Sequence, residues 1–116
     1  MIAALNLLRE LEGRRVAVLG DMLELGAFEE AGHRMVGRRA REVADLLVAV
    51  GPRARLIADE ARQSGLRPAA VVEVPDGGAA LAYLRQHIGT GDVVLLKGSR
   101  ALRLDRVVAE LEAGDA

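Results

Sequence analysis

The sequence contains no cysteine, almost no aromatic residues and no long apolar run. Without cysteine, disulfides and thiolate metal sites are excluded. No apolar stretch approaches the roughly 18 residues of a membrane-spanning helix. The first residues also lack the cationic start and the cleavage site of a signal peptide. We therefore expect a soluble cytoplasmic protein without membrane insertion.

An excess of charge of one sign is also missing. The 16 basic and 17 acidic residues leave a formal net charge of −1, which argues against nucleic acid or an anionic membrane as a partner. Hydrophobic residues make up 51% of the chain but aromatic residues only 2%, so the core must be aliphatic. A chain of 116 residues is long enough for one domain with one core.

Four short runs of aliphatic residues predict the strands. These runs are nearly continuous in apolar residues rather than alternating, which is typical of parallel strands covered on both faces. Amphipathic patterns before, between and after them predict helices. We expect strands at 15–20, 46–51, 70–75 and 92–97, and helices at about 2–12, 27–44, 53–64, 76–88 and 101–112.

The alternation of strands and helices predicts an α/β fold: a Rossmann-like three-layer domain with a mainly parallel sheet of at least four strands. The carboxyl ends of parallel strands meet at one edge of the sheet, where ligands usually bind. Residues 20–21, 51–52, 75–76 and 97–98 are therefore expected to lie together. Glu73, a charged residue within the third run, indicates that this strand lies at a margin of the sheet.

The only lysine of the chain, Lys97, ends the last run and is followed by Ser99 and Arg100. Ser99 can cap the expected next helix, and free amides at the helix start together with two cations favour an anion such as carboxylate or phosphate. The alternative is that the basic side chains reach acidic residues or water. No G-x-S-x-G elbow surrounds Ser99, which argues against a nucleophilic serine.

The loop after the first strand supplies Asp21 and Glu24, which could accept hydrogen bonds from a ligand, although a simple turn is the alternative. In the next helix His33 follows Glu29 by one turn. Such a pair could bind a metal or act as acid and base, or His33 could pack and bond a neighbour. Met22 is expected to fold onto the core, contact with another domain being the alternative. The chain has no dinucleotide fingerprint and no P-loop.

Three segments resemble the C-terminal domain of the Mur ligases: RVAVLGDMLELG at 15–26, HRMVG at 33–37 and VVLLKGSRALRLDRVV at 93–108. The likeness extends over nearly the whole chain, and LGDMLELG and KGSR are its specific parts. It implies an ATP- and Mg²⁺-dependent ligase of peptidoglycan synthesis, which converts the carboxylate of UDP-N-acetylmuramoyl-tripeptide to an acyl phosphate. The amine of D-alanyl-D-alanine then attacks this acyl phosphate.

The resemblance implies that residues 1–116 are one domain of a three-domain enzyme. This domain would close the site against a central ATPase domain and help to hold the incoming dipeptide, and alone it would be inactive and bind no cofactor. The absence of a cap before the first helix agrees with a chain cut from a longer one. The substrate-binding residues that the resemblance implies are Lys97, Ser99, Arg100, Asp21, Glu24 and His33, the role of the histidine being open.

Two other classes of protein remain as alternatives at this stage. A phospho-receiver domain would use Asp21 and Lys97, but the run at 46–51 ends without the acceptor aspartate that such a domain needs. A non-catalytic α/β interaction domain would meet its partners through Met22 and the neighbouring leucines. The sequence does not distinguish a diaminopimelate tripeptide from a lysine tripeptide.

Overall fold

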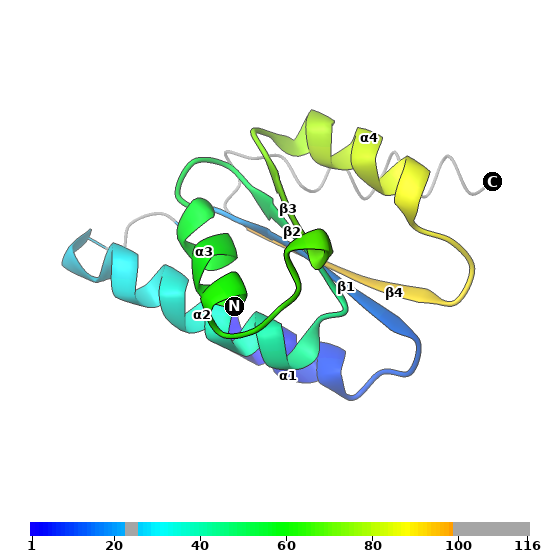
Figure 1. Cartoon of the computed structure of the whole chain (residues 1–116), viewed down its shortest axis with the longest axis horizontal. Coiled ribbons are helices and arrows are strands. Elements are labelled where there is room, and N and C mark those ends of the chain that lie inside the picture. Colours follow the sequence, from blue (N-terminus) through cyan, green and yellow to red (C-terminus); the bar gives the residue numbers. More distant parts are fainter. Residues whose placement is uncertain (23–25, 99–116) are drawn as a thin grey trace.

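A single parallel sheet with the strand order β3-β2-β1-β4 forms the centre of the domain (Figure 1). The computed structural model describes residues 1–22 and 26–98. The strands are β1 (Arg14–Gly20), β2 (Leu46–Val50), β3 (Val71–Val74) and β4 (Asp92–Lys97). All four predicted strands are confirmed, with ends that differ by at most one residue. The position of β3 at a margin of the sheet is confirmed as well.

Within the described residues, four α-helices accompany the sheet: α1 (Ile2–Arg9), α2 (Glu29–Val43), α3 (Arg55–Gln63) and α4 (Gly77–His87). Short 3₁₀ turns lie at Gly26–Phe28 and Pro68–Ala70. No helix among these described residues is long and apolar enough to cross a membrane. The helix predicted at 101–112 lies outside the described residues.

The first helix is shorter than its sequence pattern predicts. The amides of Glu10 and Leu11 bond to the carbonyls of Leu7 and Leu8, so the last turn tightens to three-residue spacing and the α-helix ends at Arg9. Leu11, which continues the apolar spacing of Leu5 and Leu8 within the predicted helix, is consequently 49% exposed.

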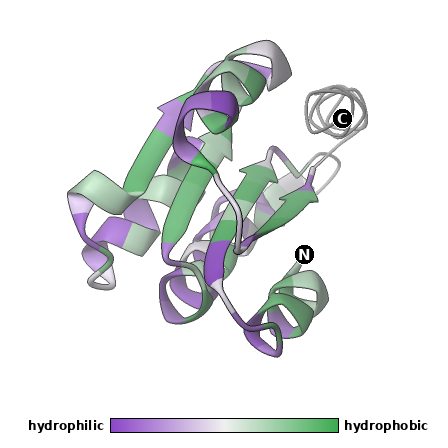
Figure 2. Cartoon of the chain, turned by 90° about the vertical axis from the view of Figure 1, so that its right-hand side faces the viewer, coloured by the Kyte–Doolittle hydropathy of each residue, from purple (hydrophilic) through white to green (hydrophobic). Residues whose placement is uncertain are grey.

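Aliphatic side chains cover both faces of the sheet and create three layers. On one face, Ala17 and Leu19 of β1 pack with the buried sides of α1, α2 and α3. On the other face, Val16 and Val18 pack with Ala80 and Leu84 of α4. The strands are accordingly green over most of their length in Figure 2, whereas the helices show both green and purple segments.

A glycine brings two of these helices into close contact. Gly37 of α2 faces α3 so closely that a Cβ atom there would lie 2.5 Å from the carbonyl oxygen of Ile57. The neighbouring positions Val36 and Ala40 are buried in the same core. The position of α2 against α3 therefore depends on the absence of a side chain at residue 37.

The strand order decides between two α/β topologies. The order 3-2-1-4 is that of the Rossmann fold, whereas phospho-receiver domains have the order 2-1-3-4-5. The observed topology therefore supports the predicted Rossmann-like class and argues against the receiver alternative. The chain changes direction across the sheet between β1 and β4, and ligands of open α/β sheets bind at such a switch point.

Candidate functional site

The carboxyl ends of β1 and β4 form the candidate site. The register pairs Leu19 with Lys97, so the chain leaves both strands side by side at the point where the topology switches. Lys97 is exposed there. Its position next to Gly20 and Asp21 agrees with the prediction that these strand ends meet. The other predicted residues of this edge, Glu24, Ser99 and Arg100, lie outside the described residues.

Asp21 is buried and uses its carboxylate inside the domain. Only 4% of the residue is exposed, and its Oδ1 accepts a hydrogen bond of 2.8 Å from the amide of Ala54, immediately before α3. Gly51 makes room for this contact: its φ is +100°, and a Cβ there would lie 2.7 Å from Oδ1. Asp21 therefore fixes the connection between β2 and α3, which is a longer-range contact than the local turn considered from sequence.

His33 is fully buried, and both of its ring nitrogens have backbone partners. Nδ1 lies 2.7 Å from the carbonyl oxygen of Glu29, and Nε2 lies 3.0 Å from the amide nitrogen of Met22. A carbonyl can only accept and an amide can only donate, so the proton of the ring is on Nδ1. The interpretation that His33 packs and bonds its neighbours is confirmed.

The acid–base or metal-binding pair of His33 with Glu29 is wrong. Only the backbone oxygen of Glu29 contacts the histidine, whereas its carboxylate lies 2.5 Å from Nε of Arg53. Within 1–22 and 26–98, no three histidine, aspartate or glutamate side chains are grouped so that they could hold a metal ion. Met22 packs against the core, as expected.

Arg53 is a residue of this edge that the sequence reasoning missed. It follows the end of β2, and its guanidinium reaches Glu29 at 2.5 Å and Oδ2 of Asp21 at 3.7 Å. It therefore links three segments of the carboxyl edge. Its position in the sequence could have identified it, because residues directly after a parallel strand lie at the edge where ligands bind.

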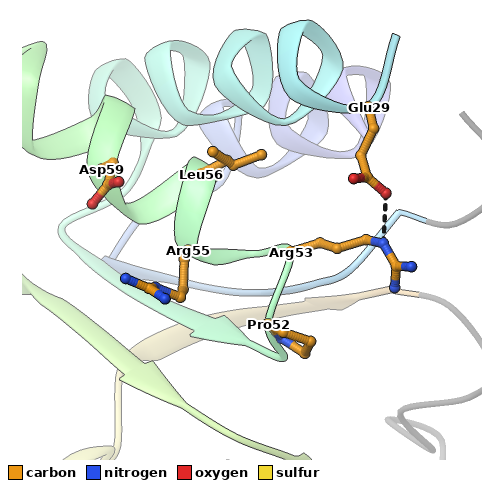
Figure 3. A pocket seen from close by; sticks show the side chains of 6 residues that line it. All are labelled: Glu29, Pro52, Arg53, Arg55, Leu56 and Asp59. Atoms are coloured by element: carbon orange, nitrogen blue, oxygen red, sulfur yellow. Dashed lines mark hydrogen bonds and ion pairs between the residues drawn. The ribbon is translucent and has the colours of Figure 1, made fainter. Parts of the chain in front are cut away.

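A hollow of about 500 Å³ lies beside Arg53, next to the start of α3. In Figure 3, Arg53 points toward Glu29, while Arg55 and Asp59 extend from α3. A second hollow of about 290 Å³ adjoins it, and Pro52 and Arg55 line both. Because the first hollow is lined by two arginines, Glu29 and Asp59, its charges balance.

The fold and this edge define a class of protein. Residues 1–100 match the family model described as Mur ligase, glutamate ligase domain. The chain therefore belongs to this family, the C-terminal domain of the Mur ligases, and the predicted resemblance is confirmed.

Particular members of the family are similar over most of the chain. The UDP-N-acetylmuramoyl-tripeptide–D-alanyl-D-alanine ligase of Mycobacterium tuberculosis (strain CDC 1551 / Oshkosh) is 41% identical over 88% of this chain and 23% of its own length. The ligase of the same name from Escherichia coli (strain K12) is 36% identical over 97% of this chain and 24% of its own length. The chain thus spans about a quarter of the length of these relatives.

Solved structures of the same ligase, MurF, have the same fold. A structure of MurF from Acinetobacter baumannii superposes with a TM-score of 0.78 at 31% identity, over 94% of this chain and 24% of that one. MurF from Thermotoga maritima, in complex with ADP, gives a TM-score of 0.72 at 28% identity, over 91% of this chain and 23% of that one.

Proposed function

We propose that this chain is the C-terminal domain of a ligase that joins D-alanyl-D-alanine to UDP-N-acetylmuramoyl-tripeptide in peptidoglycan synthesis. The observation that carries the proposal is the identity of 41% and 36% to two ligases of that name. In this proposal the enzyme is cytoplasmic, and ATP and Mg²⁺ bind to a central ATPase domain. The absence of a P-loop motif from this sequence supports that division of work.

The task of this domain is to hold the incoming dipeptide. Lys97 is exposed at the switch point, and with Ser99 and Arg100 it binds the carboxylate of D-alanyl-D-alanine. Glu24, in the loop after β1, forms the adjacent wall of the cleft, and the buried Asp21 supports this loop from inside the domain through its bond to Ala54. The free amine of the dipeptide then faces the acyl phosphate in the rest of the enzyme, and its attack releases phosphate as the amide forms.

Closure of this domain over the central one would strengthen the charge pair. The attraction between a carboxylate and the ammonium and guanidinium that hold it becomes stronger when water is excluded, because the effective dielectric constant falls. The binding energy of the dipeptide therefore helps to bring the domains together.

The substitutions Lys97→Ala and Arg100→Ala in the full-length enzyme test this proposal. Each removes one charge-assisted contact, so the KM for D-alanyl-D-alanine should rise by about tenfold or more, while the KM for ATP stays the same. Steady-state kinetics with each substrate varied in turn give both values.

Arg38→Ala is the matched control. Arg38 is 61% exposed on the outer side of α2 and lies 3.8 Å from Glu60, so its removal should change neither KM. An unchanged KM for the dipeptide in both site variants, with only their stability affected, would contradict the assignment of the binding residues.

A further inference from the structure

The two histidines of the chain form the same bond within their helices but differ in their second ring nitrogen. Nδ1 of His33 lies 2.7 Å from the carbonyl of Glu29, and Nδ1 of His87 lies 2.8 Å from that of Tyr83, each four residues earlier. His33 alone is fully buried, and its Nε2 accepts the amide of Met22. The helix bond is thus common to both, and the Met22 bond is the distinguishing feature of His33.

The segment that receives this bond lies next to the candidate anion site. Met22 directly follows Asp21, and β1 pairs with β4 so that Leu19 lies opposite Lys97. Asp21 is held from one side by the amide of Ala54. His33 holds the next residue from the other side, so residues 21 and 22 are bonded both to α2 and to the connection before α3.

The helix that carries His33 is itself fixed. Gly37, one turn further on, allows α2 to lie against α3, and Val36 is buried in the core on the same side of the sheet. A histidine on a fixed helix gives the Met22 amide a defined position. If Nε2 is removed, this half-buried amide loses its acceptor and Met22 loses its bond to α2, whereas Asp21 keeps its contacts with Ala54 and Arg53.

We infer that His33 is a positioning residue: through Nε2 it holds the Met22 amide and so keeps the end of β1 in place beside Lys97. The inference rests on the proposed function, because the consequence of this placement is measured as dipeptide binding. His33 does not contact the substrate in this account, since both of its ring nitrogens are already bonded within the domain.

Substitution of His33 by glutamine or by asparagine tests its two hydrogen bonds one at a time. The amide oxygen of glutamine stands as many bonds from Cβ as Nε2 does, so His33→Gln keeps an acceptor for Met22. The amide nitrogen of asparagine stands as many bonds from Cβ as Nδ1, so His33→Asn keeps the donor to Glu29 and loses the Met22 bond. Because asparagine is also one methylene smaller, a role in packing alone would lower the stability of His33→Asn, and urea denaturation of both variants measures that loss apart from the KM.

The first experiment is kinetic and uses the full-length ligase. His33→Asn should raise the KM for D-alanyl-D-alanine roughly tenfold with the KM for ATP unchanged, and His33→Gln should restore the low KM. His87→Asn is the control. His87 is the last residue of α4 and makes the same bond within its helix, so this substitution should change neither KM. Equal KM values for the Asn and Gln variants would overturn the inference.

The second experiment distinguishes this inference from the proposed function. Amide hydrogen exchange of Met22 in the present chain should be faster in His33→Asn than in His33→Gln, whatever the enzyme does. If Lys97→Ala leaves the dipeptide KM unchanged, the proposed binding site fails. If Lys97→Ala raises this KM and His33→Asn does not, the site stands and the positioning role is overturned.

Discussion

At the scale of single residues, Asp21 and His33 are the two buried polar side chains among the described residues. Both were predicted as candidates from their types and their place near a strand end. Their partners could not be predicted, because these are the backbone amides of Ala54 and Met22. Every residue except proline has a backbone amide, so the residue types of Ala54 and Met22 do not indicate which amide a buried side chain will bind.

Asp21→Ala should lower the free energy of unfolding by about 1–3 kcal/mol, because the buried amide of Ala54 loses its acceptor. Asp21→Asn keeps an oxygen at the same place and should cost less. Urea denaturation followed by circular dichroism measures both, since the chain has no tryptophan. Equal losses in the two variants would show that the charge of Asp21, rather than its hydrogen bond, is the stabilising feature.

At the scale of elements, strands were predicted more accurately than helix ends. The β4 run from Asp92 to Lys97 was predicted to the residue, because a continuous apolar segment bounded by polar residues leaves little freedom. The first helix was predicted too long, because its apolar pattern continues to Leu11 while its hydrogen bonds tighten after Arg9. Apolar spacing reports which face is buried and does not report the bonding of the last turn.

Gly37→Ala tests the contact between α2 and α3. The added Cβ would lie 2.5 Å from the carbonyl oxygen of Ile57, so the helices must separate, which should destabilise the domain by about 1–3 kcal/mol. Gly78→Ala in α4 is the matched control. Its nearest atom would be 3.4 Å away, so stability should stay the same or rise by up to about 1 kcal/mol.

Thermal unfolding of both variants gives the comparison. A Gly37→Ala variant as stable as the Gly78→Ala variant would contradict the view that this close helix contact limits the size of residue 37.

At the scale of the whole molecule, the sequence predicted the parallel sheet but not its strand order. Crossover helices of similar length are compatible with the orders 3-2-1-4 and 2-1-3-4, since both keep right-handed connections. Glu73 correctly placed β3 at a margin, but nothing in the apolar run of β4 indicated the neighbour that it would have. The meeting of Lys97 with the end of β1 therefore needed the structure.

The isolated chain should neither hydrolyse ATP nor join peptides, because its sequence lacks a P-loop. Release of phosphate from ATP, measured for the purified chain beside the full-length ligase, tests this expectation. Turnover by the chain alone would contradict the proposed division between this domain and a central ATPase domain.

The charged residue on β3 has a consequence for how copies of the domain meet. Oε2 of Glu73 lies 2.9 Å from Arg62 of α3, and Oε1 lies 3.7 Å from Arg55, so a four-residue marginal strand carries an ion-paired cluster. An uncharged strand there would offer its free amides and carbonyls to any other extended chain. A short marginal strand with a charged, ion-paired side chain is a poorer template for such pairing, so Glu73 has a place in the fold that is independent of ligand contacts.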